Sequence, residues 1–328
     1  QARMKRQITF FSALLFFFLR QPQEVISFTF LGDHLCHHDD ALALLQFKET
    51  FSINASTYAS TYCDKWDQHS YPKMTHWKPD TDCCNWDGVT CHNITGRVIG
   101  LDLSCSHLQG LILPNSTLFH LSHLRRLNLA FNDFIGSRIS HRFGWMTSLA
   151  HLNLSSSSFD GKVASEISYL SNLISFDLPS LFPCDSMGCW VLRYEPNSFE
   201  AMLQNLTQLK ELSLSWMSIP FELRTNFSSP LTYLSLKGTG IRGNLLSNVF
   251  HLPNMQVLLL GDNENLTVSL PKLNCSIFYS LRQLDLSSTS FSAALPDLKG
   301  CAVSLNSLNL GSCQISGVIP ESIGNFTQ

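Results

Sequence analysis

The residues best suited to chemistry are cysteines and histidines gathered near the amino terminus. Thiolate and imidazole groups are the usual ligands of zinc. The sequence has no pair of C-x2-C knuckles, however, and its eleven cysteines are typical of secreted chains, in which cysteines form disulfides. We therefore predict disulfides rather than a metal site. The residues concerned are Cys83, Cys84, Cys91 and His92, with His34, His37 and His38 upstream.

Sequence motifs for catalysis are absent: there is no Gly-rich phosphate loop, no H-E-x-x-H and no G-x-S-x-G. Carboxylates stand singly, and His120, His123 and His251 occupy H-L-x-x-L contexts typical of solvent-facing positions. The chain carries 22 basic and 25 acidic residues, a balance that argues against a nucleic-acid partner. We expect no enzymatic activity, no cofactor and no bound metal.

A periodic pattern of apolar residues dominates the rest of the chain. Its clearest copy is L-x-x-L-x-L-x-x-N-x-F-x-G, which runs from Leu124 to Gly136 and is the leucine-rich-repeat pattern. Nine copies follow one another at intervals of 22 to 36 residues. They start at Val98, Leu124, Leu149, Leu173, Leu209, Leu231, Met255, Leu281 and Leu305.

The spacing predicts a solenoid. L-x-L alternates with period two, so each copy forms a short strand with its leucines inward, and the stacked strands form a parallel sheet on the concave side. The Asn132 position turns the chain, and its amide can bond neighbouring backbone. Small residues fill the same position in other repeats: Ser157, Thr239, Asn263, Thr289 and Cys313. One repeat cannot bury its leucines alone, so neighbours must cover them.

The segment before the repeats is expected to cap the solenoid, because the first apolar layer would otherwise be exposed. We assign residues 33–97 to this cap. Asp39 and Asp40 are favourable at a helix start, and Leu44, Phe47 and Phe51 share one helical face. Residues 1–32 form a predicted signal peptide and leader, with Met4 as the expected start of translation.

Two groups of residues resemble the plant extracellular class of leucine-rich repeats. One is D-x-x-A-L-L-x-F-K followed by W and C-C-x-W-x-G-V-x-C in the cap; the other is the L/I-x-G-x-I-P ending, complete at Gly317-Val318-Ile319-Pro320. In that class the extra segment makes a second short strand. His34-Leu35-Cys36, Ser70-Tyr71-Pro72 and the stretch from Leu103 to Gly110 are similar to the tomato Cladosporium-resistance (Cf-type) receptor-like proteins.

The resemblance implies disulfides Cys84–Cys91 and Cys36–Cys83, which leaves Cys63–Cys105 as a further pair. Cys184 and Cys189 can close a small loop, and Cys275 and Cys301 lie at similar phase in adjacent repeats. Cys313 is then the odd cysteine, expected as a buried thiol. Nine sequons for N-glycosylation favour the secretory pathway: Asn54, Asn93, Asn115, Asn153, Asn205, Asn226, Asn265, Asn274 and Asn325.

The resemblance also implies a function. Residues 98–328 would be the first repeats of a cell-surface immune receptor that senses a pathogen-derived or apoplastic protein or peptide. Family members continue into more repeats, one membrane span and a short tail without a kinase, and they act through partner receptor kinases. We therefore expect a type I membrane protein, of which this chain lacks the carboxyl-terminal cap and span. A secreted inhibitor of fungal polygalacturonase and the ectodomain of a receptor kinase are the alternatives.

The concave face is the expected ligand-binding surface. Trp216 and Tyr233 are its most promising anchors, because exposed aromatic residues beside charged ones are common at binding sites; local packing of these aromatic rings is the alternative. The sequon at Asn153 lies on the same face, so a glycan there would cover nearby strands. Residues 179–208 are an irregular segment, expected as architecture first and contact site second. The predicted contact residues are Arg125, Arg126, Asn128, Phe131, His151, Lys210, Glu211, Trp216, Tyr233, Lys237, Arg282 and Asp285.

Overall fold

The computed structural model describes residues 36–56, 63, 69–178, 192–222, 227, 230–245, 249, 252–268, 280–294 and 305–318. The chain divides into two compact units, Gln1–Asp33 and His34–Gln328. The first unit holds the predicted signal peptide and lies outside the described residues. The architecture reported below is that of the second unit.

Short strands and single helical turns make up most of the second unit. The α-helices are α2 (His38–Lys48) and α4 (Pro196–Asn205), and the 3₁₀ turns are η1 (Lys73–His76), η2 (Cys83–Asn85), η3 (Thr117–His120), η4 (His141–Trp145) and η5 (Ser165–Tyr169). The strands are β1 (Phe51–Ile53), β2 (Val89–Cys91), β3 (Val98–Asp102), β4 (Leu108–Gly110), β5 (Arg126–Asn128), β6 (His151–Asn153), β7 (Ser175–Asp177), β8 (Glu211–Ser213), β9 (Tyr233–Ser235), β10 (Gly243–Asn244), β11 (Val257–Leu259), β12 (Asn263–Val268), β13 (Gln283–Asp285), β14 (Thr289–Ala294), β15 (Ser307–Asn309) and β16 (Gln314–Ser316).

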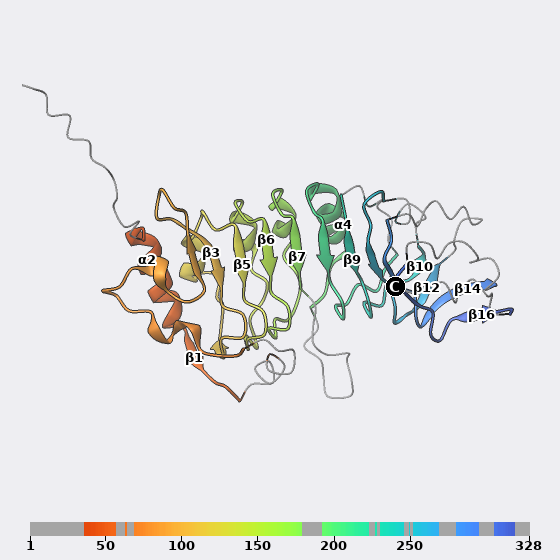
Figure 1. Ribbon diagram of the computed structural model, residues 1–328, viewed down its shortest axis with the longest axis horizontal. Helices are drawn as coiled ribbons and strands as arrows, with labels where there is room; N and C mark the ends of the chain where they lie inside the picture. The colour runs from red at the N-terminus through yellow and green to blue at the C-terminus, as the bar shows by residue number, and fades with distance from the viewer. Residues whose placement is uncertain are drawn as a thin grey trace, which may run out of the picture. The chain divides into compact units, whose positions relative to one another are not determined.

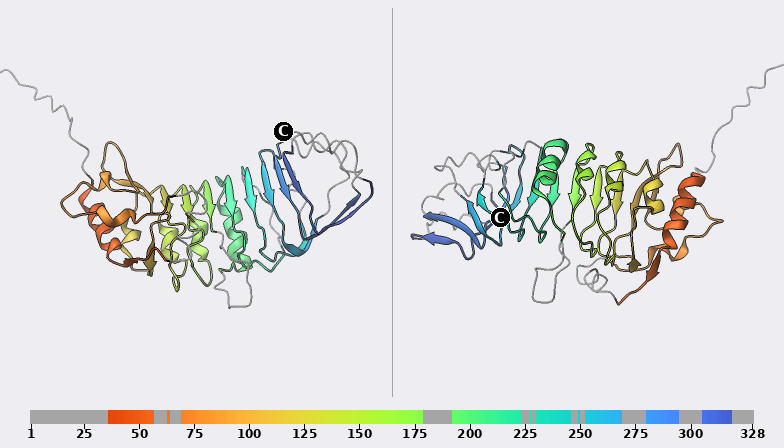
Figure 2. Two further views of the ribbon diagram at one scale, coloured as in Figure 1. Left: turned by 60° about the horizontal axis from the view of Figure 1, so that its bottom comes forward. Right: turned by 180° about the vertical axis from the view of Figure 1, so that it is seen from behind.

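One sheet of ten strands runs through the repeats in the order β15-β13-β11-β9-β8-β7-β6-β5-β3-β2. Every neighbouring pair from β3 to β15 is parallel, and only β2, from the cap, is antiparallel to its neighbour. The strands lie side by side, with α4 and the adjoining turns η3, η4 and η5 on the other side of the repeats (Figures 1 and 2). The predicted parallel sheet of a leucine-rich-repeat solenoid is therefore confirmed.

The second strand of the plant class is also present. Strands β10, β12, β14 and β16 form a separate parallel sheet of four strands after the turns of the later repeats. In the earlier repeats the same place is held by isolated parallel bridges, such as Gln109 with Asp133 and Arg138 with Asp160. Each repeat is thus joined to the next along two lines of backbone hydrogen bonds.

The core is the stack of inward apolar residues that the repeat pattern predicts. Each of the strands β3, β5, β6 and β7 contributes one inward residue, which stands opposite that of the next strand in register and is at most 1% exposed: Leu101, Leu127, Leu152 and Phe176. Burying a side chain of this size stabilises the fold by about 1.5–3 kcal/mol. The nearly invariant register means that each repeat covers the apolar layer of its neighbour.

At the turn that follows each strand, a polar side chain is hydrogen-bonded to the backbone and fixes the path of the chain. Asn132 is 0% exposed, and its Nδ2 donates to the backbone carbonyls of Leu103 at 2.7 Å and Leu129 at 3.0 Å. Asn263 repeats this arrangement. The hydroxyls of Ser157, Thr239 and Thr289 and the thiol of Cys313 also donate to backbone carbonyls. The predicted role of this position is confirmed.

The cap covers the first repeat, with one correction to the predicted helix. Helix α2 buries Leu44 and Phe47 but ends at Lys48, so Phe51 lies on strand β1 and not on the helical face. Its ring still contacts Phe47, with 4.8 Å between ring centroids. Strand β1 pairs antiparallel with β4 of the first repeat. Pairing with the repeat therefore ends the helix sooner than the apolar pattern indicated.

Asp40 connects the cap helix to the main sheet. Its carboxylate is 3% exposed, lies 2.9 Å from the Arg97 guanidinium and accepts a hydrogen bond from the backbone N–H of Val98 at 2.9 Å. As predicted, Asp39 and Asp40 mark the start of the helix: both stand in its first turn, which begins at His38 with His37 as the N-cap. Asp40 therefore stabilises a tertiary contact.

The long interval between the fourth and fifth repeats does not interrupt the sheet. Strands β7 and β8 pair directly, with Phe176 opposite Leu212. Of the predicted irregular segment 179–208, residues 179–191, with Cys184 and Cys189, lie outside the described residues. The remainder forms helix α4, which buries Phe199, Met202 and Leu203 where the preceding repeats have a 3₁₀ turn.

The last described repeat is less covered than the others. Leu305 is buried, whereas Leu308, Leu310 and Ile315 are half-buried and Val318 is 81% exposed. Cys313 is a free, half-buried thiol and not the fully buried one expected. Among the described residues, the two helices are too short and too polar to cross a bilayer.

Replacing Asn132 by Ala should lower the free energy of unfolding by about 3 kcal/mol, because buried backbone groups of two repeats lose their partners. Urea unfolding of the secreted protein measures the change. Asn172→Ala is the control, since Asn172 is exposed and its amide makes one backbone bond, to Thr147. Equal and small losses in both variants would contradict the structural role of this position.

Candidate ligand-binding surface

The concave face presents two rows of outward side chains from the main sheet, one on each side of the inward leucines. The row at the first strand position includes Arg126, His151, Glu211 and Tyr233. The row at the last strand position is almost entirely polar. It consists of Asp102, Asn128, Asn153, Asp177, Ser213, Ser235, Leu259, Asp285 and Asn309.

Many side chains of the polar row are hydrogen-bonded to the backbone. The side-chain oxygens of Asn128, Asn153 and Asp285 each accept a hydrogen bond from the backbone N–H two residues later, at 2.9–3.1 Å. Asp102 and Asn309 do the same. Such a bond competes with strand pairing and turns the chain out of the sheet. These residues therefore set where each strand ends, which reduces what they can offer to a ligand.

Titratable groups gather where β6, β7, β8 and β9 lie side by side. Burial raises the pKa of Asp177 to about 6; the Ser213 hydrogen bond opposes this rise and the charge of Glu211 adds to it. One carboxylate oxygen, Oδ1 of Asp177, is buried without a hydrogen-bond partner among the described residues. Burial and the Asp177 charge also raise the pKa of Tyr233.

His151 completes this central cluster of Asp177, Glu211, Tyr233 and His151. Burial, then the charge of Arg126, lowers the pKa of His151, and Glu211 acts in the opposite direction. The four groups come from successive strands, with His151 and Glu211 at the same level of the sheet as Tyr233. The cluster can form hydrogen bonds with a ligand and respond to its charge, and none of its members is a buried nucleophile.

Lys237 is part of an ion-pair network on the later repeats. Its ammonium lies 3.1 Å from Asp285 and 3.3 Å from Asp262. Burial opposes the charge of Lys237, but these two carboxylates outweigh it and raise its pKa. Asp285, predicted as a contact residue, is only 7% exposed. Both residues are therefore engaged with each other.

Trp216 does not stand on a concave strand, contrary to the prediction. It lies in the turn after β8, with φ at +64°, and a Cβ on Gly238 would overlap its ring. The aromatic side chain thus packs over the backbone of the next repeat, where only glycine leaves room. Phe131 occupies the matching turn after β5, with φ at +56°. The sequence pattern had placed both aromatic residues on strands, because it extended each strand beyond the residue where the strand ends in the structure.

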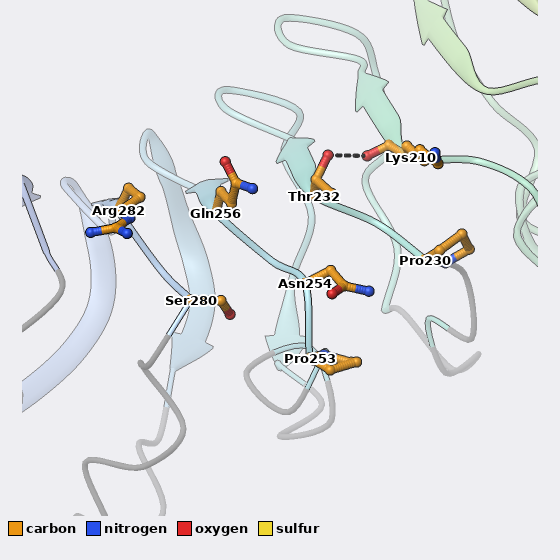
Figure 3. Close-up of a pocket in the computed structure, with 8 residues that line it drawn as sticks. All are labelled: Lys210, Pro230, Thr232, Pro253, Asn254, Gln256, Ser280 and Arg282. Carbon is orange, nitrogen blue, oxygen red and sulfur yellow. Dashed lines mark hydrogen bonds between the residues drawn. The ribbon is translucent and has the colours of Figure 1, made fainter.

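A groove lies at the edge where the strands of the later repeats begin. Its volume is about 420 Å³, and Lys210 and Arg282 line it together with Thr232 and Gln256. Figure 3 shows these four side chains in one line, each just before a strand, with Pro230, Pro253, Asn254 and Ser280 beside them. A second groove of about 330 Å³ lies at the same edge of the first repeats and includes Arg125.

The structure therefore separates the twelve predicted contact residues into three places. Arg126, Asn128, His151, Glu211, Tyr233 and Asp285 are on strands. Arg125, Lys210 and Arg282 are exposed at the strand-start edge, and Phe131, Trp216 and Lys237 are in the turns. Sequence reasoning missed Asp177 as a member of a cluster, since its burial depends on the neighbouring strands.

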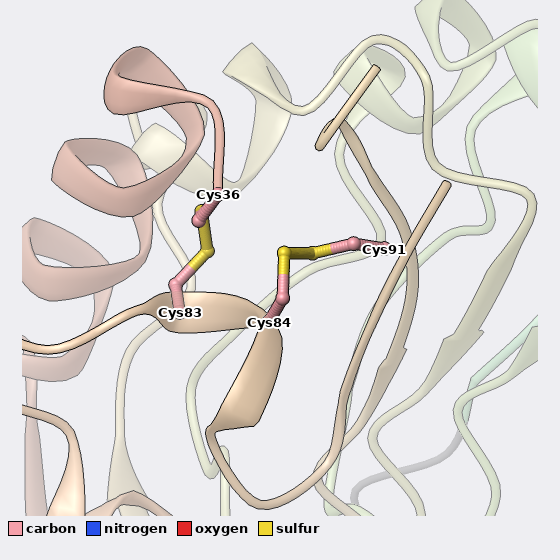
Figure 4. Close-up of side chains that lie close together, drawn as sticks. All are labelled: Cys36, Cys83, Cys84 and Cys91. Carbon is pink, nitrogen blue, oxygen red and sulfur yellow. A yellow bond between two sulfur atoms is a disulfide. The ribbon is translucent and has the colours of Figure 1, made fainter. Parts of the chain in front are cut away.

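The cap cysteines are paired as disulfides. The structure joins Cys36 to Cys83, Cys63 to Cys105 and Cys84 to Cys91, with 5.3, 5.9 and 5.4 Å between the respective Cα atoms. These are the pairs expected for the cap. The sulfurs of Cys36, Cys83, Cys84 and Cys91 all lie within 4.8 Å of one another. Figure 4 shows the two disulfides that they form. A disulfide offers no thiolate to zinc, so this cluster serves as a covalent link. Cys275 and Cys301 lie outside the described residues.

The predicted glycosylation sites differ in accessibility. Asn93, Asn115, Asn205 and Asn265 are exposed. Asn54 is half-buried and its Nδ2 donates to Gln109, and Asn153 is half-buried on β6. Asn226, Asn274 and Asn325 lie outside the described residues. Glycosylation at any of these positions stays a prediction.

The sheet, the disulfide-bonded cap and the repeated polar turn define a leucine-rich-repeat protein of the plant extracellular type. Two families match the sequence: "Leucine rich repeat N-terminal domain" at residues 37–92 and "Leucine Rich Repeat" at residues 304–326. The chain has the leucine-rich-repeat fold, and the curated relatives it matches include plant receptor-like proteins.

Two such relatives come from Solanum pimpinellifolium. Receptor-like protein Cf-9 is 45% identical over 267 residues, which are 80% of this chain and 30% of that protein. Receptor-like protein 9DC1 is 42% identical over 287 residues, which are 87% of this chain and 32% of that protein. The chain thus spans about a third of the length of the curated relatives it matches.

A solved structure with the same fold is the Arabidopsis receptor kinase HAESA in complex with the peptide hormone IDA and the co-receptor SERK1. Its TM-score is 0.60 at 22% identity, over 88% of this chain and 52% of that chain. This likeness supports the fold. The resemblance to Cf-type receptor-like proteins stated from the sequence is confirmed by the curated relatives.

A reductant and a metal chelator should act differently on the cap. Peptide mapping without reduction should recover Cys36–Cys83, Cys63–Cys105 and Cys84–Cys91. Reduction should lower the melting temperature, because each disulfide typically contributes about 2–4 kcal/mol. A chelator should leave the melting temperature unchanged. Free, alkylated Cys84 and Cys91 in the secreted protein, or loss of stability with the chelator alone, would contradict the disulfide-bonded cap.

Asp177 should make the fold more stable at mildly acidic pH. Its pKa rises from 3.8 to about 6 on folding, so the folded state holds a proton that the unfolded state has lost. Stability from this group is present below pH 3.8 and falls as the pH rises through about 6, by up to about 3 kcal/mol.

Asp177→Asn removes this titration and keeps the side chain's size. Urea unfolding of the secreted protein at pH 4.5 and pH 7 should show a smaller loss of stability for the variant than for the parent protein. Parallel changes of the two proteins with pH would show that Asp177 does not carry the difference.

Proposed function

We propose that this chain is the extracellular ligand-recognition region of a plant cell-surface receptor-like protein in pathogen perception. The ligand is a pathogen-derived or apoplastic protein or peptide. The region has no catalytic role and passes its signal to partner receptor kinases. The whole protein is anchored by a membrane span outside this chain and faces the extracellular side.

The similarity to Cf-9 carries this proposal, because it extends over 80% of the chain at 45% identity. The cap and the first repeats are shared with proteins described as receptor-like. HAESA, which has the same fold, is described in complex with a peptide hormone and a co-receptor. A fold of this kind can therefore hold a peptide and a second protein at once.

The concave face and its edge support a binding role. Among the described residues, the central cluster of Asp177, Glu211, Tyr233 and His151 is spread over four neighbouring strands, whereas enzymes need a cleft that excludes water. Tyr233 is half-buried on β9, so part of its side chain stays accessible to a ligand. We propose Tyr233 and Glu211 as contact residues, and Trp216 as a packing residue.

The test uses the full-length gene product in leaf cells. Cells that express it should produce a defence response, read as a burst of reactive oxygen, when treated with extracellular fluid from infected leaves. Tyr233→Ala should raise the dose for half-maximal response roughly thirtyfold, which corresponds to a loss of about 2 kcal/mol. A partner receptor kinase should co-precipitate with the parent protein.

Tyr169→Ala is the matched control, because Tyr169 is 60% exposed and lies in η5, on the opposite side of the repeats from the sheet. It should respond like the parent protein, and all three proteins should reach the cell surface in equal amounts. A full-length protein that gives no response to any infected fluid and binds no kinase would refute the receptor role. Secretion without a membrane anchor, with inhibition of a fungal polygalacturonase, would replace it with the inhibitor role.

A further inference from the structure

The residues just before the strands from β5 to β15 form a continuous row along one edge, which begins at Ile99 within β3. Each member donates its backbone N–H to the carbonyl of the member before it. The bond is 2.8 Å from Lys210 to Ile174, 2.8 Å from Thr232 to Lys210 and 2.7 Å from Arg282 to Gln256. This edge row consists of Ile99, Arg125, Ala150, Ile174, Lys210, Thr232, Gln256, Arg282 and Asn306.

Three cations stand in the edge row, and all are exposed: Arg125, Lys210 and Arg282. Within the described part of the chain none of the three has a carboxylate partner, whereas Arg97 and Lys237 are paired with aspartates. An unpaired cation on a fixed backbone is free to bind an anion from outside. The chain carries a net charge of −3, so these cations are not part of a generally basic surface.

The cations also line the two grooves at this edge. Lys210 and Arg282 flank the larger groove, with the hydroxyl of Thr232 and the amide of Gln256 between them (Figure 3). Arg125 lines the smaller one with Arg97. None of the described residues that line either groove is acidic. Both grooves therefore combine positive charge with hydrogen-bonding groups suited to carboxylates and peptide amides.

The spacing of the cations is regular. Arg125 precedes β5, Lys210 precedes β8 and Arg282 precedes β13, and each step crosses three neighbouring strands. Neighbouring strands lie about 4.8 Å apart, so successive cations stand about 14 Å apart along the edge. An extended peptide advances about 3.4 Å per residue, and residues four apart lie on the same side of it. Four residues therefore span about 14 Å.

We infer that the edge row binds an extended acidic peptide whose carboxylates recur at every fourth residue. This inference rests on the proposed function and names the chemistry of its ligand. The peptide lies across the strands, each acidic side chain reaching one cation, with its backbone over Thr232 and Gln256. Glu211 and Asp177 on the neighbouring strands disfavour acidic side chains at that part of the concave face, whereas Arg126 lies further along it. The charge pattern thus places the acidic side chains of the ligand at the edge and leaves its other groups free to contact Tyr233 and Glu211.

Synthetic ten-residue peptides test this inference with the secreted protein. One probe has three glutamates, one at every fourth position, among serine, threonine and asparagine. A second has the same composition with the glutamates at every third position, so that they alternate between sides. Titration calorimetry should show at least tenfold tighter binding of the first probe. Equal affinities for the two probes would overturn the inference.

Double variants of this protein test whether the peptide binds at the edge row. The double variant Lys210→Gln with Arg282→Gln should lose at least tenfold in affinity for the first probe. The control, Lys78→Gln with Arg242→Gln, removes the same charge from exposed positions outside the edge row and should change the affinity less than twofold. An equal loss in both double variants would show binding by net charge alone and would overturn the inference.

The leaf-cell assay separates this inference from the receptor role. A loss of response in the Lys210 and Arg282 variant, with correct surface delivery, supports the edge as the ligand site. A full response in that variant, together with a lost response in Tyr233→Ala, overturns the edge site and leaves the receptor role intact.

Discussion

The structure depends on satisfying the backbone groups where each strand of the sheet turns outward. At that point the chain leaves a hydrogen-bonded ladder inside a packed stack, where water cannot replace the lost partners. Asn132 supplies hydrogen-bond partners to backbone groups of two repeats. Its amide nitrogen donates to the carbonyls of Leu103 and Leu129, and its amide oxygen accepts from the backbone N–H of Leu108. The stack of leucines can close only around such a satisfied turn.

This constraint explains why the repeats tolerate so much variation elsewhere. Serine, threonine and cysteine replace asparagine at the turn because each keeps one of its two kinds of hydrogen bond. Ser157 and Cys313 donate to a carbonyl of the preceding repeat, and Thr239 and Thr289 donate to a carbonyl of their own repeat. The helical side varies from a 3₁₀ turn to the α-helix α4, since only its buried apolar residues touch the sheet. Strands β7 and β8 consequently pair across the longest interval between repeats. The outward strand positions and the edge are left free to carry recognition.

Most of the architecture followed from the period of the sequence. Leucine spacing predicts the strands, their parallel pairing and their inward face, because every repeat must bury the same positions. The places where a contact with another part of the chain overrides the local sequence pattern were harder to predict. Phe51 fits the helical face by spacing, yet pairing with β4 places it on a strand. Asp40 looks like a helix cap by type, yet the Arg97 guanidinium and a backbone N–H outside the helix hold its carboxylate.

The sequence predicted which side chains point outward better than it predicted which of them are free to contact a ligand. The pattern named the residues that leave the sheet, but it could not show which of them are engaged. Lys237 and Asp285 come from repeats two apart and neutralise each other, which only the register reveals. Trp216 covers the glycine of the next turn. Lys210 and Arg282, by contrast, have no such partner in the described chain. The register of the strands thus decides which outward charges are compensated by their neighbours and which are left available to a ligand.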